Sequence, residues 1–260
     1  MKIQLVAFRQ CFVWLGAGWF AFKSNLGAWL VLSILFLITL MLLGILPFVG
    51  ILFVALFMPF LLTGLLVSAH RSLVGSLARV EDMLMGFNDD RLRRPLLQLG
   101  SFMALGTLLI FIALYPLSLE ALKATYTTQS DTHLAATLVA MEQSSPVSLL
   151  LQMGVIALVL MAFFYATPLV LFEDQAPLDA VTNSLLACLK NIIPLTLFGV
   201  MVLILGFIAS FAFGLGYLVL IPVLASANYA SFRDTFDPVE PPEDEPPNNT
   251  RKMPRARSSA

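Results

Sequence analysis

Long apolar stretches alternate with short polar segments along most of this chain. Six stretches lack Asp, Glu, Lys, Arg and His, and they cover residues 26–46, 48–69, 96–119, 147–172, 192–213 and 215–231. An α-helix needs about 20 apolar residues to cross the roughly 30 Å hydrocarbon core of a bilayer. The pattern therefore predicts an all-α, polytopic membrane protein with six transmembrane helices within residues 1–236.

The pattern also predicts two helices that do not cross the membrane. Within residues 177–191, apolar positions recur every three or four residues, while the residues between them form a second face. The apolar face consists of Leu178, Val181, Leu185, Cys188 and Ile192, and the opposite face consists of Asp179, Asn183, Ala187 and Lys190. Such a helix is expected to lie at the headgroup boundary, with the following Asn191 capping its end.

A similar pattern occurs 166 residues earlier. The matched pairs are Phe12 with Leu178, Leu15 with Val181, Trp19 with Leu185, Phe22 with Cys188, Asn25 with Asn191, and Gly50 with Gly216. Both copies read as an interfacial amphipathic helix, an outward span, a tight turn containing glycine, and an inward span with a proline. We therefore predict a parallel internal repeat. Chance recurrence of a short amphipathic connector is the alternative reading.

The distribution of positive charge predicts the orientation. Fourteen of the 15 Lys and Arg residues fall on one side of a six-span arrangement, and Lys123 is the exception. Loops rich in Lys and Arg remain in the cytoplasm. Both termini and both amphipathic helices are therefore predicted to be cytoplasmic.

Composition supports the membrane class and separates a tail from it. Hydrophobic residues make up 59% of the chain and charged residues 12%, whereas soluble domains average about 25% charged residues. After residue 236 the sequence becomes PVEPPEDEPPNN and then RKMPRARSSA. Residues 237–260 are therefore predicted to form a disordered, Pro-rich, charged cytoplasmic tail. No feature suggests binding to nucleic acid.

Prolines interrupt all three inward spans, at Pro59, Pro168 and Pro222. Because proline lacks an N–H, each is expected to free a carbonyl and to kink its helix. Scattered intramembrane amides and hydroxyls such as Asn228 are expected to bond to neighbouring helices.

The sequence offers little sign of catalytic chemistry. His70 and His133 have no Cys or acidic partner at ligand spacing and are expected to be surface residues. We predict no catalytic, cofactor-binding or metal-binding residue, and no cofactor. The most distinctive polar groups are juxtamembrane cations that can anchor topology or hold lipid headgroups; they are Arg91, Arg93, Arg94, Lys190 and Arg233.

Several segments resemble a known group of proteins. The segments are EDMLMGF at 81–87, PLDAV at 177–181, SLLACLKN at 184–191 and ANYASFRD at 227–234. They resemble an uncharacterised family of proteobacterial inner-membrane proteins and, more remotely, the membrane domain of some glycerophosphodiester phosphodiesterases. The likeness covers most of residues 10–236 and implies a location in the bacterial inner membrane. It implies no activity, because the catalytic domain of the phosphodiesterases has no counterpart here.

Three functions remain open from the sequence. The first is a non-enzymatic inner-membrane protein that organises or assists lipids or partner membrane proteins, including a second copy of itself. The second is a channel or facilitator for a small or amphiphilic molecule. The third is a membrane enzyme that uses Glu81, Asp82, Glu173 or Asp174 at headgroup depth. The first is favoured because no catalytic or ion-coupling residue is recognisable.

Overall fold

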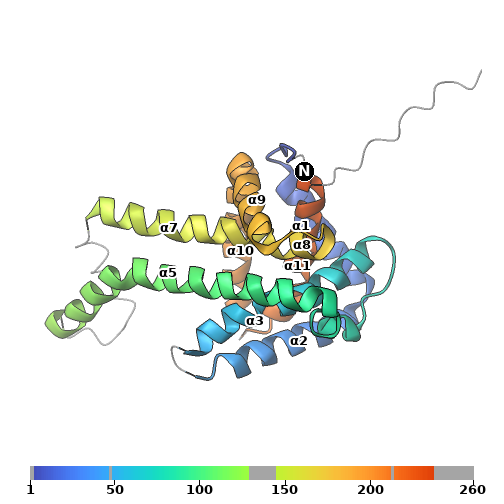
Figure 1. Cartoon of the computed structure of the whole chain (residues 1–260), viewed down its shortest axis with the longest axis horizontal. Coiled ribbons are helices and arrows are strands. Elements are labelled where there is room, and N and C mark those ends of the chain that lie inside the picture. Colours follow the sequence, from blue (N-terminus) through green and yellow to red (C-terminus); the bar gives the residue numbers. More distant parts are fainter. Residues whose placement is uncertain (1–2, 47–48, 129–144, 212–213, 237–260) are drawn as a thin grey trace, which may run out of the picture.

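Helices make up every regular element in the described part of the chain. The computed structural model describes residues 3–46, 49–128, 145–211 and 214–236 (Figure 1). The predicted tail at 237–260 and most of the loop between the third and fourth predicted spans lie outside these residues. In chain order the elements are α1 (Gln10–Ser24), α2 (Leu26–Leu43), α3 (Val49–Leu73), the 3₁₀ turn η1 (Val80–Leu84), α4 (Met85–Asn88), α5 (Asp90–Thr128), α7 (Pro146–Phe164), α8 (Ala166–Phe172), α9 (Pro177–Lys190), α10 (Ile192–Phe211) and α11 (Tyr217–Phe236).

Within the described residues, five helices are long and apolar enough to cross a membrane. They cover Leu26–Leu43, Val49–Leu73, Asp90–Leu117, Pro146–Phe172 and Ile192–Phe211, which correspond to the first five predicted spans. The sixth predicted span is also helical, as α11. This helix contains Pro222 and Asn228 and continues through Arg233 and Asp234, which makes it less apolar than the other five.

The core lies at one end of the bundle. Its buried side chains gather where α3, α8 and α11 end and where α5 begins; they include Leu65, Leu92, Leu96, Leu169 and Phe232. Figure 1 shows α5 and α7 running alongside each other and projecting beyond the other helices. Large apolar side chains on these helices, such as Ile112 and Leu150, are exposed. Exposed apolar surface on this scale is typical of helices that face lipid.

A hydroxyl group interrupts the fourth span at Tyr165. In a regular helix, the Tyr165 N–H would donate to the Met161 carbonyl. Instead, Ser184 of α9 lies between them. Its Oγ accepts from Tyr165 N at 2.9 Å and donates to Met161 O at 2.7 Å. Because a side chain inserted into the hydrogen-bond ladder kinks or divides a helix, the fourth span consists of two segments, α7 and α8.

Pro168 removes a second hydrogen bond from the same region. The Phe164 carbonyl, four residues earlier, cannot receive an N–H from proline. The Asn228 Nδ2 of α11 donates to this carbonyl at 3.3 Å. The prediction of a freed carbonyl is therefore confirmed at this proline, as is the bonding of Asn228 to a neighbouring helix. Ser33 and Thr107 differ, because their hydroxyls donate to carbonyls of their own helices.

Helices α1 and α9 bury the same pattern of positions. The buried residues of α1 are Cys11, Trp14, Gly18, Ala21 and Phe22, and those of α9 are Pro177, Ala180, Ser184, Ala187 and Cys188. Each residue of the first set lies 166 positions before its counterpart in the second, as the numbers 11 and 177 or 22 and 188 show. Gly18 lies directly against the backbone of Val223 in α11, and the corresponding Ser184 lies against the backbone of α7.

The faces that these helices bury against the protein are not the apolar faces that were predicted to lie towards the membrane. Leu178 and Phe12, both assigned to apolar faces, are 65% and 54% exposed. The α9 face that contacts the protein carries small residues, which allow two helix backbones to approach closely. Ala187, placed on the polar face by the sequence pattern, is fully buried there. On α9, small size rather than hydrophobicity marks the face that packs on the protein.

An asparagine at the end of each helix holds a distant extended segment. The Asn25 Nδ2 donates to Ala78 O at 3.1 Å, and the Asn25 side chain also caps α2. The Asn191 Oδ1 accepts from Val6 N at 2.8 Å, and its Nδ2 donates to Gln4 O at 2.9 Å. These two asparagines therefore connect helix ends to segments far away in the sequence.

Candidate functional site

The cationic residues predicted as headgroup or topology anchors lie on three elements. Arg91, Arg93 and Arg94 are exposed in the first turns of α5. Lys190 is exposed at the last residue of α9, whereas Arg233 lies in α11 and is partly buried. These five cationic residues therefore do not form a single cluster.

Two of the α5 arginines form ion pairs at the surface. The Arg91 Nη1 lies 3.1 Å from Asp174 Oδ1, just after α8, and the Arg93 Nη1 lies 2.9 Å from Asp90 Oδ1. All four side chains are more than half exposed. Exposed pairs of this kind contribute about 0–1 kcal/mol each. Arg91 therefore links the start of α5 to the end of the fourth span without dominating its stability.

His70 and Arg233 meet at the hydroxyl of Tyr229. The His70 Nδ1 lies 2.5 Å from Tyr229 Oη, and the Arg233 Nη1 donates to the same oxygen at 3.3 Å. The His70 ring also packs edge-on against the Tyr229 ring. His70 is therefore a partly buried contact between α3 and α11, rather than the surface histidine that the sequence suggested.

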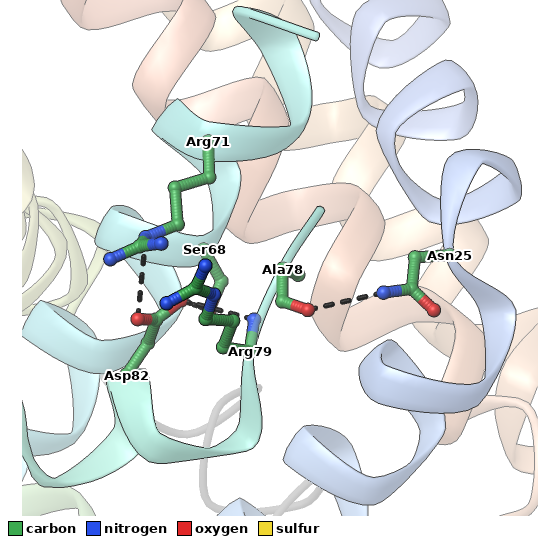
Figure 2. A network of polar contacts seen from close by, with 6 residues as sticks. All are labelled: Asn25, Ser68, Arg71, Ala78, Arg79 and Asp82. Atoms are coloured by element: carbon green, nitrogen blue, oxygen red, sulfur yellow. Dashed lines mark hydrogen bonds and ion pairs between the residues drawn. The ribbon is translucent and has the colours of Figure 1, made fainter. Parts of the chain in front are cut away.

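The most connected polar group is the buried carboxylate of Asp82 in η1. Its side chain is 5% exposed. The Asp82 Oδ1 lies 3.3 Å from the Arg71 Nε, and the Asp82 Oδ2 accepts from Ser68 Oγ at 3.2 Å and from Arg79 N at 3.1 Å. Figure 2 shows these groups meeting between the end of α3 and the turn that follows it, with Asn25 on the far side of Ala78.

Local sequence explains how Asp82 reaches this place. Asp82 lies three residues after Arg79, so its carboxylate can bond the backbone N–H that opens the 3₁₀ turn, as in a capping box. Gly64 lets the turn approach α3, because a Cβ there would lie 2.6 Å from the Cα of Met83. Sequence reasoning noted Arg71 only as a cytoplasmic charge. The spacing of Arg79 and Asp82 was the signal that could have revealed the turn.

An open pocket lies beside this network. It has a volume of about 770 Å³ and is lined by Arg71, Arg79, Glu81, Asp82, Met85, Asn88 and Asp89. The lining therefore includes two guanidinium groups and three carboxylates. Because Asp82 is buried and engaged by three partners, it fixes one wall, whereas Arg79, Glu81 and Asn88 are exposed. The pocket can receive a ligand that carries both signs of charge.

The Asp82 carboxylate is engaged in structural contacts at this pocket. Both Asp82 oxygens already accept hydrogen bonds or pair with Arg71, so the carboxylate has little capacity to act as a general base. Among the described residues, no three His, Cys, Asp or Glu side chains gather in a way that could hold a metal ion.

Comparisons with protein-family models, with curated proteins and with solved structures find no match for this chain. The resemblance to the proteobacterial inner-membrane family therefore stays a prediction, and the site is interpreted from its own geometry.

Proposed function

We propose that this chain is a non-enzymatic, six-span inner-membrane protein that organises or assists lipids or partner membrane proteins on its cytoplasmic side. The observation that carries this proposal is the open, charged pocket at the packed end of an otherwise apolar bundle. In this proposal both termini lie in the cytoplasm, and the resemblance to the proteobacterial family remains an expectation.

The distribution of charge along α11 supports six spans. This helix follows α10 after a short connection and packs against α1 and α3. Its charged residues, Arg233 and Asp234, lie in its last turn. With α11 counted as a span, these charges fall on the same side as Arg71 and Arg91, and the positive-inside distribution is preserved.

Three correspondences support the parallel repeat. The five buried positions of α1 and α9 share one register. Asn25 and Asn191 each bind a distant backbone segment. Gly50, in the first turn of α3, and Gly216, in the turn before α11, both approach the preceding helix closely: a Cβ would lie 2.9 Å from Gly44 C and 2.5 Å from Ala209 Cα, respectively. Independent matches in packing, hydrogen bonding and turn geometry favour duplication over chance recurrence.

Exposed apolar residues support an interfacial position for α1 and α9. Phe12 and Trp19 on α1, and Leu178 and Leu189 on α9, are between 45% and 65% exposed. Bulky apolar groups on the outer side of a helix whose opposite side packs on the protein are suited to the headgroup and acyl boundary. The same geometry also provides a surface for another membrane protein.

Purification of the full chain directly into native nanodiscs tests the proposed function. Mass spectrometry of the particles should show specific lipids or partner proteins enriched over the bulk membrane. A matched six-span protein of unrelated sequence, prepared in the same way, gives the background. Absence of any enrichment would contradict the proposal. Tracer flux into vesicles that contain the purified chain would instead favour a channel or facilitator.

A further inference from the structure

We propose that the pocket lined by Arg71, Arg79, Glu81 and Asp89 binds the zwitterionic headgroup of an ethanolamine phospholipid. This ligand deepens the proposed membrane function and rests on it. The shared chemistry is a phosphate ester joined to a primary amine, whether it comes from a lipid or from a soluble phosphoethanolamine.

The phosphate half of this ligand suits the two guanidinium groups. The Arg71 Nε pairs with Asp82, while its Nη1 and Nη2 make no hydrogen bond within the described residues. The exposed Arg79 side chain lines the same pocket. Arginine binds phosphate through paired N–H groups. Because Asp82 holds Arg71, part of the cost of ordering the phosphate-binding side chain is already met on folding.

The amine half suits the acidic side of the pocket. Glu81, Asn88 and Asp89 line the pocket. The Asp89 Oδ1 accepts from the Arg91 N–H at 2.9 Å, and its Oδ2 lies 4.0 Å from the Arg91 Nε. Arg71 already pairs with Asp82, and Arg91 with Asp89. The exposed Glu81 is therefore the carboxylate best placed to receive an ammonium group. A ligand that brings both charges satisfies both sides.

The side chains that line the pocket also distinguish a primary amine from a quaternary one. An ammonium group donates hydrogen bonds to carboxylates and amide oxygens, which Glu81, Asp89 and Asn88 provide. A choline group cannot donate, and proteins bind it through aromatic cages. None of the described residues that line this pocket is aromatic. Ethanolamine is therefore favoured over choline.

Exposed apolar side chains in the chain segment that supplies Arg79 and Glu81 favour a lipid over a soluble ligand. Val74, Leu77 and Leu84 belong to the segment between α3 and α4, and they are 57%, 62% and 56% exposed. Three large exposed apolar residues within this short segment would be unfavourable in water, but they can contact acyl chains at the membrane boundary. These three residues flank the pocket-lining Arg79 and Glu81 in sequence.

Native mass spectrometry of the full chain tests this ligand. The chain is reconstituted in bilayers that contain equal amounts of phosphatidylethanolamine, phosphatidylcholine and phosphatidylglycerol, and the retained lipids are counted after gentle delipidation. Phosphatidylethanolamine should be retained several-fold over the other two. Because charged hydrogen bonds are lost, Arg79→Gln and Glu81→Gln should each reduce its retention about tenfold. Both side chains are exposed, so the variants are expected to fold.

Arg94→Gln is the matched control, because Arg94 is an exposed arginine close in sequence that does not line the pocket. Its lipid retention should equal that of the unmodified chain. Equal retention of the three lipids, or equal retention by all variants, would overturn this site while leaving general lipid or partner enrichment intact. Displacement of the lipid by millimolar glycerophosphoethanolamine alone would assign the pocket to a soluble ligand and overturn the lipid proposal. Enrichment of no lipid and no protein would also remove the proposed function.

Discussion

The hydroxyl of Ser184 receives the backbone N–H of Tyr165 at 2.9 Å and divides the fourth span where α9 packs on it. Tyr165 is fully buried, and so is Ser184. One polar atom therefore fixes both the bend in a membrane helix and the position of the helix that follows it.

Ser184→Ala should destabilise this junction. The substitution leaves the Tyr165 N–H without its acceptor, while the Met161 carbonyl keeps only the Cys188 thiol as a donor at 3.4 Å. An unsatisfied buried group costs about 1–3 kcal/mol. We expect a lower thermal midpoint of the folded, monodisperse fraction in detergent. The control is Thr182→Ala, which removes an exposed hydroxyl from the same helix and should change stability by less than about 0.5 kcal/mol. Equal midpoints for the two variants would argue against this role for Ser184.

Asn191→Ala should release the first described residues of the chain. The Val6 N–H loses its acceptor, so its amide hydrogen exchange should become faster while α5 keeps its protection. Asn25→Ala is the matched variant. It should loosen the segment around Ala78 and leave Val6 unchanged. Faster exchange at Val6 in both variants would indicate general destabilisation instead of two separate contacts.

Corresponding positions of α1 and α9 should respond alike to added volume. Ala21 and Ala187 are fully buried, so Ala21→Leu and Ala187→Leu should each cost about 1–3 kcal/mol by overpacking. Gly16 and Thr182, a pair with the same 166-residue separation, are exposed. Leucine at either exposed position should be tolerated in a folded-yield assay. If leucine were tolerated at one member of a pair and destabilising at the other, the shared register of α1 and α9 would be wrong.

The thiol of Cys188 should be inert in the folded chain. Burial, partly offset by the hydrogen bond with Ser184, raises the pKa of Cys188 to about 12. Because the folded state keeps this proton, ionisation of the thiol does not affect the free energy of unfolding below its ordinary pKa of 9.0. The free energy of unfolding decreases as pH rises from there towards 12. In a Cys11→Ser background, a hydrophilic maleimide should not modify Cys188 at pH 8 until denaturant is added.

Labelling of an exposed thiol provides the control for that experiment. Ser76 lies exposed in the segment after α3, so Ser76→Cys in the same background should react within minutes. Rapid labelling of Cys188 under native conditions would show that α9 does not remain packed on α7.

Hydrophobic patterning was sufficient to predict the helical membrane class and the first five spans, because long apolar runs have few alternatives to a spanning helix. The break at Tyr165 was partly predictable from Pro168. The insertion of Ser184 was not predictable, because it depends on contact between two helices. The packing faces of α1 and α9 were not predictable for the same reason. Hydrophobicity marked Leu178 and Phe12, which are exposed, whereas Gly18, Ser184 and Ala187 are buried against other helices.

The candidate pocket was less predictable than the fold. The sequence marked Arg91, Arg93 and Arg94 by their clustering, yet the structure places Arg71 and Arg79 beside Asp82 through a turn that folds back on α3. Charge clustering along a sequence does not reveal which charges share a pocket. The burial of Asp82 depends on the gap opposite Gly64, which only the packed helices create.

Reporter fusions test the central claim, a six-span chain whose charged pocket lies at the cytoplasmic end. Paired phosphatase and fluorescent-protein fusions are placed after Arg79, Gln129, Asp179 and Asp244 in the full chain. Six spans with cytoplasmic termini predict cytoplasmic readings at Arg79, Asp179 and Asp244 and a periplasmic reading at Gln129. A cytoplasmic reading at Gln129, or a periplasmic reading at Arg79, would contradict it.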